Sequence, residues 1–344
     1  MDNITLFHGA GGSITYRFIK DHILPLLNPY LKFDVSLIDL DDAGIYNDIV
    51  FSTDSYTVKP LFFNGGDIGR LSIAGTVNDI SVIGGKPIAL SLSLIIEEGF
   101  MIDELDKILR SIEYTCKEAE VDIITGDTKV VEKGLLDKLI INTSGIGIRH
   151  PLLDANIRYL NRGSRWLVDS NLREGDKIII SGTIADHGMA ILSSREGYEF
   201  STSIKSDVMP LNKLIDRILE VGGVASINDP TRGGVANLLN EWSEKSGVGI
   251  IIYEEKIPIN ESVKAAASFL GLDPLEIGNE GKICLAVMDE KANEILDAIR
   301  EYGFKDAEII GEVTDQFKAV AMKTIVGGTR IIPKPIGDPV PRIC

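Results

Sequence analysis

The last residue of the sequence, Cys344, is a thiol that follows a proline-rich segment. Each proline fixes φ and removes a backbone donor, which excludes a helix or a central strand. We therefore expect an extended arm over residues 333–344 that reaches roughly 35 Å, at about 3.1 Å per residue. A nucleophile on such an arm can be loaded at one site and carried to another; the alternative is a disordered tail that ends in cysteine by chance. The prolines are Pro333, Pro335, Pro339 and Pro341.

Three isolated aspartates, Asp54, Asp79 and Asp127, each lie beside an apolar stretch. An unpaired carboxylate is costly there. Three such carboxylates that converge on Mg²⁺ would remove this cost and could bind polyphosphate oxygens. For any single aspartate, an N-cap or a turn is the plainer interpretation. Lys129, two residues after Asp127, favours a nucleotide site for the set as a whole.

Glycine-rich segments add anion-binding candidates at 8–12, 64–67 and 229–234. Their backbone N–H groups could approach an anion, and the last two segments precede expected helices, whose N-termini favour negative charge. Ordinary turns are the alternative for each. Glu280, between Asn279 and Gly281, is either a solvated loop residue or a base that faces a site.

The composition limits the class of protein. The formal net charge of −16 argues against binding to nucleic acid or anionic lipid. No run of about 18 apolar residues is present, and the N-terminus has no secretory pattern, so we expect a cytoplasmic protein. Three separated cysteines and four unclustered histidines make disulfides and a zinc site unexpected. No P-loop, dinucleotide fingerprint or nucleophile elbow occurs.

Periodicity and turn signals divide the chain into two α/β segments, an N-terminal segment and a tail. We expect the segments at 1–34, 35–160, 161–320 and 321–344. In the first α/β segment, strands are predicted at 34–40, 45–53, 88–96, 122–125 and 138–148, and helices at 68–83 and 103–119. In the second, strands are predicted at 177–181, 249–253, 282–288 and 307–313, and helices at 187–195, 209–221, 234–246, 262–270 and 289–302.

Six motifs taken in order resemble the HypE family of hydrogenase expression/formation proteins, over nearly the whole chain. This family belongs to an ATP-binding group with aminoimidazole ribonucleotide synthetase, selenophosphate synthetase and thiamine-monophosphate kinase. The aspartate motifs are typical of the larger group, whereas D-P-T-R-G-G and the terminal P-R-I-C are typical of HypE. The motifs are Thr53–Ser55, Thr76–Asp79, Gly126–Val130, Asp229–Gly234, Asn279–Gly281 and Pro341–Cys344.

The resemblance implies a two-domain PurM-like α/β fold. The N-terminal sheet would pair with that of a second copy in a homodimer, which makes a β-barrel, and ATP would bind near that interface. A second α/β domain would follow, and then a flexible tail that carries Cys344.

The resemblance also implies a reaction. The carbamoyltransferase HypF would place a carbamoyl group on Cys344, and MgATP would drive dehydration of the S-carboxamide to a thiocyanate. The cyanide would pass to iron on the HypC–HypD scaffold. Glu280 would remove N–H protons with help from Lys129. By resemblance, ATP would be bound by Asp54, Asn78, Asp79, Asp127 and Thr128, with Mg²⁺ held by Asp54, Asp79 and Asp127.

Two other interpretations stay open from the residues. One is a small-molecule ATP-dependent kinase or synthetase of the same group, which would use the aspartates but not Cys344. The other is a non-catalytic carrier whose tail only presents a thiol and which has no dependence on MgATP.

Overall fold

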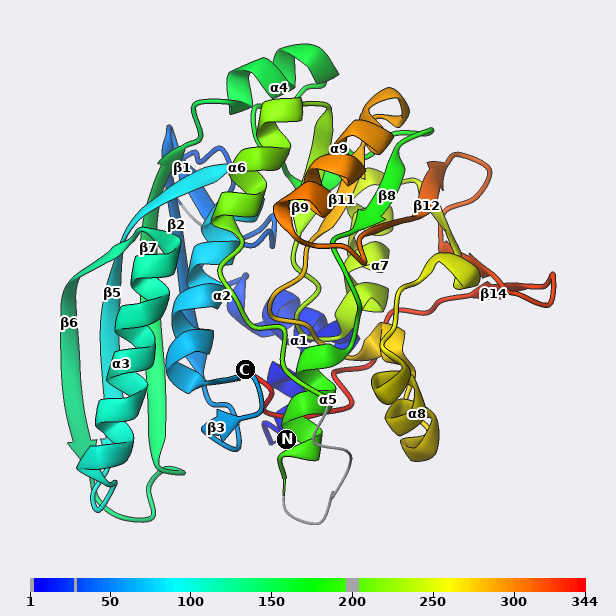
Figure 1. Ribbon diagram of the computed structural model, residues 1–344. Coiled ribbons are helices and arrows are strands. Elements are labelled where there is room, and N and C mark those ends of the chain that lie inside the picture. The colour runs from blue at the N-terminus through cyan, green and yellow to red at the C-terminus, as the bar shows by residue number, and fades with distance from the viewer. Residues whose placement is uncertain (1–2, 28–29, 196–203) are drawn as a thin grey trace.

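A computed structural model of the chain describes residues 3–27, 30–195 and 204–344. It contains two α/β halves. The N-terminal helical segment and the C-terminal tail lie between these halves in space (Figure 1). This confirms the predicted α/β class. No helix within the described ranges is long and apolar enough to cross a membrane.

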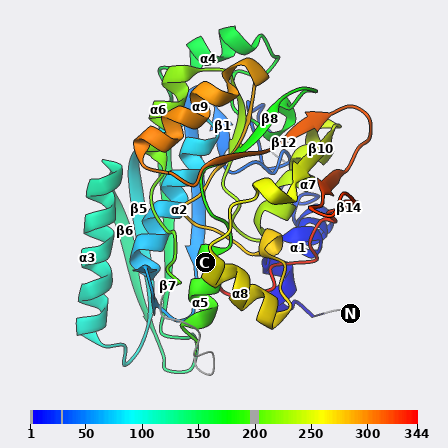
Figure 2. The same ribbon diagram turned by 45° about the vertical axis from the view of Figure 1, so that its right-hand side comes forward.

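The N-terminal half is built on a five-stranded sheet with the order β1-β2-β7-β5-β6. Only β5 and β6 run parallel; the other neighbouring pairs are antiparallel. Figure 2 shows α3 and β6 at the end of the sheet that lies farthest from the second half. The strands are β1 Gly44–Tyr46, β2 Ile49–Tyr56, β5 Gly85–Glu97, β6 Asp122–Val131 and β7 Leu139–Arg149; the helices on one face are α2 Ile68–Val82 and α3 Ile102–Ala119; a hairpin pairs β3 Phe62–Phe63 with β4 Gly66–Asp67.

Alternation along the strands gives this sheet one covered face and one exposed face. Val50, Leu90 and Ile141 are buried with residues of α2 and α3. The opposite, outer face carries Phe51 and Ile148, which are 49% and 45% exposed. Large apolar side chains are thus left uncovered on the outer face of a single copy.

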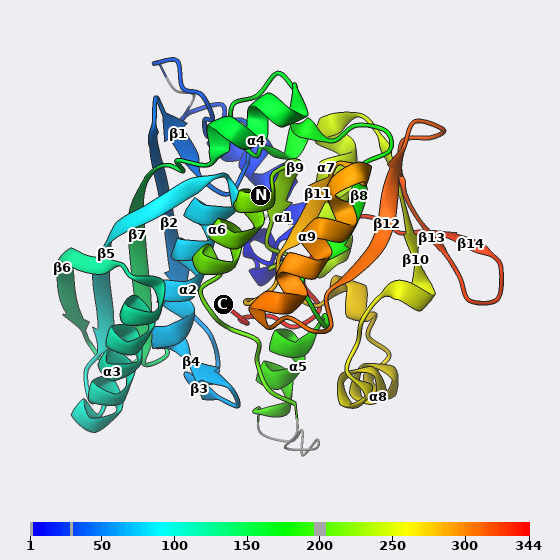
Figure 3. The same ribbon diagram turned by 45° about the horizontal axis from the view of Figure 1, so that its top comes forward.

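The second half is built on a seven-stranded sheet with the order β14-β13-β10-β12-β8-β11-β9. Ile179 faces the cluster that contains α6 and α9, whereas its neighbours Ile178 and Ile180 face the cluster that contains α7. Figure 3 shows α6 and α9 side by side. The strands are β8 Lys177–Ile180, β9 Val224–Asn228, β10 Gly249–Tyr253, β11 Cys284–Val287, β12 Glu308–Thr314, β13 Val320–Lys323 and β14 Thr329–Ile331; the helices are α5 Asp186–Ser193, α6 Asn212–Val221, α7 Gly234–Ser246, α8 Glu261–Leu270 and α9 Asp289–Tyr302.

Helical segments at the ends of the two halves complete the fold: η1 Leu6–Gly9, α1 Gly12–Phe18, η2 Ile19–Ile23, α4 Leu153–Leu160, η3 Asp169–Asn171, η4 Glu254–Lys256 and η5 Pro274–Glu276. The N-terminal segment lies against the tail. The N–H groups of Ser13 and Ile14 donate to the carbonyls of Pro335 and Ile336, at 2.9 and 3.3 Å.

Most of the predicted helices and strands are present, with three differences. The strand expected at 34–40 is wrong, since only an isolated bridge joins Val35 to Ile45. The strand expected at 45–53 is divided into β1 and β2 by a turn in which Asn47 has φ 56°. The tail expected from residue 321 begins later, because β13 pairs with β10 and β14 pairs with β13.

Candidate active site

Three carboxylates from distant parts of the chain meet where the two halves face each other. Asp42 precedes β1, Asp79 lies on α2, and Asp229 follows β9. One ligand oxygen from each lies within 4.8 Å of the other two. Asp79 accepts a hydrogen bond from Ser52 on β2 at 2.7 Å, which orients its carboxylate at the end of the sheet. Asp54, on the same face of β2, lines the same cavity.

The negative charge of the acid cluster of Asp42, Asp79 and Asp229 is only partly compensated by Arg232 and Lys245. Burial, and then repulsion from Asp54 and Asp229, raises the pKa of Asp79 well above its usual value. Burial raises the pKa of Asp229 to about 7, and its Oδ2 has no hydrogen-bond partner among the described residues. Several oxygen donors that repel one another at close range fit a hard divalent cation such as Mg²⁺.

Glu280 lies beside this cluster on the segment before β11. It is 2% exposed, and its Oε1 has no hydrogen-bond partner within the described ranges. Burial, and then Asp229 and Asp207, raises the pKa of the carboxyl well above its usual value. Its main-chain N–H donates to Asp207 Oδ1 at 3.1 Å, and Asp207 in turn forms an ion pair with Lys282 at 3.1 Å. The main chain at Glu280 is thus anchored through Asp207, while its Oε1 is left without a partner among the described residues.

Cys344 enters the same cavity from the opposite side. The cavity is lined by both Glu280 and Cys344, together with Asp54, Asp79, Asp229 and Arg232. Removal from water raises the pKa of Cys344 to about 12, against an opposing effect of Arg232. The negative charge that Cys344 gains when its thiol ionises, and beyond it that of Asp54 and Glu280, raises the pKa of Arg232 in return. The thiol is therefore held in its protonated form.

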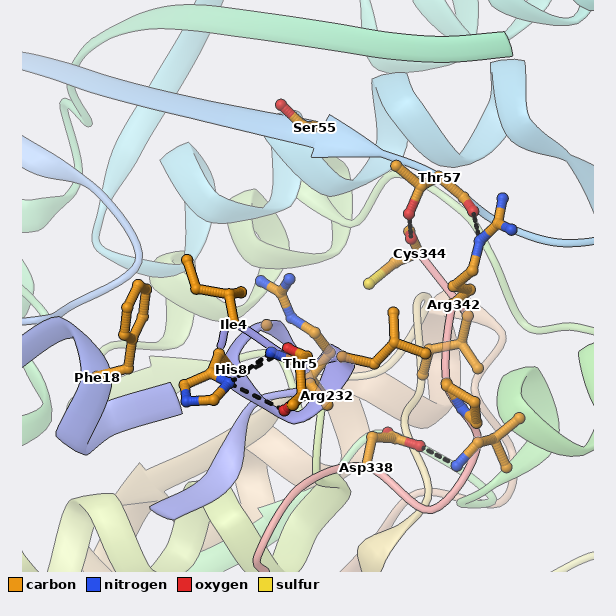
Figure 4. A pocket seen from close by; sticks show the side chains of 16 residues that line it. Ile4, Thr5, His8, Phe18, Ser55, Thr57, Arg232, Asp338, Arg342 and Cys344 are labelled. Carbon is orange, nitrogen blue, oxygen red and sulfur yellow. Dashed lines mark hydrogen bonds between the residues drawn. The ribbon is translucent and has the colours of Figure 1, made fainter. Parts of the chain in front are cut away.

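A second cavity adjoins the first, between the tail and the N-terminal segment. Figure 4 shows the sulfur of Cys344 directed into it, toward Ile4 and Arg232. His8 lies on the far wall. Asp338 fixes the base of the tail, since its Oδ2 accepts from the N–H of Gly233 at 3.1 Å and its own N–H donates to Ala10 at 2.8 Å.

The residues predicted for the site fall into two groups. Asp54, Asp79, Glu280 and Cys344 are brought together in one cavity. Asp127, Thr128 and Lys129 are not, since they lie on the edge strand β6, where Asp127 and Lys129 form an exposed ion pair at 3.4 Å.

Asn78 also differs from the prediction that it binds nucleotide. It is fully buried, its Nδ2 donates to Met209 at 3.2 Å, and its Oδ1 accepts from Leu211 at 2.8 Å. Both ends of the amide are therefore used to join α2 to the chain before α6.

Sequence reasoning did not select Asp42, Asp229 or Arg232 as site residues. Asp229 and Arg232 belong to the D-P-T-R-G-G segment, which was noted only for its glycines and as a family motif. Asp42 had a weaker signal, as one of two adjacent aspartates before Ala43 and Gly44.

Family models match both halves of the chain. AIR synthase related protein, N-terminal domain, matches residues 40–149, and AIR synthase related protein, C-terminal domain, matches residues 173–323. Among curated proteins, a putative hydrogenase expression/formation protein of Methanocaldococcus jannaschii is 52% identical, with 99% of each chain covered. Carbamoyl dehydratase HypE of Bradyrhizobium diazoefficiens is 45% identical, with 99% of this chain and 96% of the relative covered.

Solved structures agree in fold. HypE in a HypE–HypF complex superposes with a TM-score of 0.84 and 46% identity, over 92% of this chain and 99% of that chain. The hydrogenase maturation protein HypE in complex with ATP superposes with a TM-score of 0.80 and 38% identity, over 99% of this chain and 100% of that one.

Proposed function

Because this chain belongs to the HypE family of carbamoyl dehydratases, we propose that Cys344 carries the group on which it acts. The reaction is the ATP-dependent dehydration of an S-carboxamide to an S-thiocyanate, which supplies cyanide during hydrogenase maturation. The observation that carries the proposal is that Cys344 and Glu280, whose Oε1 has no hydrogen-bond partner in the described part of the chain, share one cavity with the acid cluster.

Each part of the cavity has a role in this chemistry. MgATP, when bound, supplies the phosphoryl group that turns the carboxamide oxygen into a leaving group. Asp42, Asp79 and Asp229 are the residues that would hold the cation. Arg232 offsets negative charge beside Cys344. A buried acceptor with a raised pKa suits proton abstraction near neutrality, so Glu280 takes the N–H protons of the carboxamide.

The docked tail restricts the access of water to the reacting group. Ile343 and Val340 are each 1% exposed, and they pack in a hydrophobic cluster that contains residues of both halves, while Cys344 itself is partly buried. A carbamoyl thioester is open to hydrolysis, so a closed position favours dehydration over loss of the group. Loading by HypF and transfer to the HypC–HypD scaffold require the thiol outside, so the tail has at least one other position. These steps place the protein in the cytoplasm with its partners.

We also propose a homodimer that completes the site. The pairing register places Asp127 opposite Ser93, Ser93 opposite Asn142, and Asn142 opposite the exposed Ser55, so Asp127 lies on the outer face. This face carries exposed apolar side chains, and nine of the ten residues of β6 are exposed. A second copy packed there would cover the apolar face and bring its own Asp127, Thr128 and Lys129 toward the nucleotide.

The decisive experiment is the intact mass of protein carbamoylated on Cys344, before and after MgATP. The proposal expects the loss of one water mass, confined to the C-terminal peptide and absent in Asp79→Asn. Cys344→Ser provides the matched control, since it cannot form the carbamoyl thioester. An unchanged mass with intact ATP in the wild type would contradict the proposal and favour a carrier without catalysis.

A further inference from the structure

The main chain of the tail is bound over its last four residues, 341–344, by donors from four separate positions. We call these four positions the tail cradle. Arg195 donates to the carbonyls of Pro341 and Arg342, and the N–H of Lys59 donates to Arg342 at 3.1 Å; His187 bonds Ile343 at 2.8 Å, and the N–H and Oγ1 of Thr57 donate to Cys344 at 3.2 and 3.3 Å.

Among the residues of the tail cradle, His187 is the one whose surroundings fix both the orientation and the tautomer of its side chain. It lies on α5, is fully buried, and meets the edge of Phe63 with ring centroids 5.5 Å apart. The Ile343 carbonyl can only accept, so Nε2 of His187 must carry the proton. In the neutral ring Nδ1 is then an acceptor, and Ser206 Oγ donates to it at 2.8 Å while accepting from the N–H of Val208 at 3.1 Å. One tautomer satisfies every bond.

The segment that orients His187 also orients Glu280. Ser206 fixes the imidazole, and the next residue, Asp207, accepts the main-chain N–H of Glu280 at 3.1 Å. The same short segment therefore sets the position of the base on one side and of the Ile343–Cys344 peptide on the other. Ser206 is itself anchored, since its N–H donates to Asn64 at 2.8 Å.

We propose that His187 is a positioning residue for the dehydration, and that it holds the last peptide unit so that the group on Cys344 faces Glu280. The inference rests on the proposed function for its catalytic consequence. Its structural content stands apart from that function, because the bond to Ile343 keeps the unloaded thiol in the cavity.

The test uses the full-length protein with His187→Leu and measures two rates. The first is the alkylation of unloaded Cys344 by iodoacetamide, followed by peptide mass so that Cys116 and Cys284 are separated. The second is single-turnover dehydration of carbamoylated protein with MgATP. Loss of one buried hydrogen bond to the tail should speed alkylation about tenfold and slow dehydration at least as much. The rate at which HypF loads Cys344 should not fall, because loading needs the thiol outside the cavity.

Two variants separate positioning from general packing. His187→Gln keeps a side-chain donor and should recover most of the protection of Cys344. His150→Leu is the matched control, since His150 is also buried but bonds Asp216 on α6, and it should change neither rate.

Unchanged alkylation and dehydration in folded His187→Leu would overturn the proposal. If His187→Leu does not fold, Ser206→Ala is the deciding variant, since it removes the hydroxyl that orients the His187 ring. Ser206→Ala should speed the alkylation of Cys344. An unchanged alkylation rate in this variant would also overturn the proposal. The alkylation rate needs neither ATP nor a loaded thiol, so a wild-type protein that protects Cys344 but does not dehydrate contradicts the proposed function alone.

Discussion

The Oε1 of Glu280, which has no hydrogen-bond partner among the described residues, lies in the cavity that the thiol of Cys344 enters, although Glu280 precedes β11 and Cys344 ends the tail. The acid cluster borders the same space. The proposed base, the proposed substrate carrier and the candidate cation site thus share one cavity, and the Glu280 side chain is almost fully buried there.

Replacing Glu280 with glutamine should remove the base and keep the shape of the side chain. We expect single-turnover dehydration to fall at least about 100-fold, which is typical of a lost general base. ATP binding and loading of Cys344 should persist, since neither uses this carboxylate. Glu276→Gln is the control, because Glu276 lies on the same segment but does not line the cavity. Dehydration at the wild-type rate in Glu280→Gln would assign the base elsewhere.

Replacing Asp79 with asparagine should stabilise the metal-free protein and abolish its response to Mg²⁺. In chelator, the variant should be more stable by about 1 kcal/mol, because one of several mutually repelling buried carboxylates is removed. Mg²⁺ should raise the melting temperature of the wild type and leave that of the variant nearly unchanged. Asp154→Asn, at an exposed site on α4, should respond as the wild type does. Equal shifts in all three proteins would place the cation away from the cluster.

Mixing two inactive variants tests whether β6 acts in the site of a second copy. If Asp79 and Asp127 serve one site from different copies, Asp79→Asn and Asp127→Asn should each be inactive alone. After mixing and exchange of subunits, half of the molecules are mixed dimers with one intact site of two, so about a quarter of the wild-type activity should return. Mixtures that stay inactive, with exchange shown by mass, would indicate that both residues act within one copy.

The alkylation rate of Cys344 should have an unusual pH profile. The docked thiol has a pKa of about 12, against an ordinary value of 9.0. Its folded value is raised, so docking is fully favoured below pH 9 and weakens as pH rises from 9 toward 12. Above pH 9 a released thiol is already almost fully ionised, but the fraction of tails that are released keeps growing with pH. The alkylation rate of the wild type should therefore keep rising about tenfold per pH unit.

The comparison for this profile is His187→Leu, in which docking of the tail should be about tenfold weaker. Its alkylation rate should level off about one pH unit below that of the wild type, because less ionisation of the thiol is needed to release the tail. Stopped-flow measurement with a thiol reagent from pH 7 to about 10.5 covers the useful range. A wild-type rate that levels off at pH 9 would mean that Cys344 is not held in the cavity.

The residues that sequence reasoning identified in the cavity share a local signal. Asp54 and Asp79 each stand beside an apolar run, where an unpaired carboxylate needs an explanation, and Glu280 precedes a predicted strand. Asp127 has the same apolar neighbours but lies on the edge strand β6, so this signal alone does not locate the cavity. Asp42 and Asp229 complete the cluster only because a loop and a turn from different halves meet at α2. No local sequence pattern predicts such a contact between distant segments. The short strand β9, Val-Ala-Ser-Ile-Asn, lacks alternation because both of its faces are buried, and it was missed for that reason.

The tail shows the same limit. The prolines of the tail correctly exclude a helix, but the prediction of a flexible arm does not include the residues that bind the tail. Docking depends on Thr57, His187 and Arg195, which are remote in the sequence and become adjacent only in the folded protein. Likewise, the early start predicted for the tail reflects the weak apolar pattern of β14, which pairs at the edge of the sheet.

Under the proposed function, with Cys344 as the carrier in a homodimer, the docked tail makes each copy its own substrate. The group on Cys344 meets Glu280 as part of one molecule, so its delivery follows an effective concentration set by the chain and not by the amount of protein in solution. Dehydration then has no Michaelis constant for its acceptor, only a docking equilibrium, and each loading permits one turnover. The rate after loading should be the same in dilute and in concentrated protein as long as the dimer persists, which frees the reaction from competition by any other carbamoylated thiol in the cell.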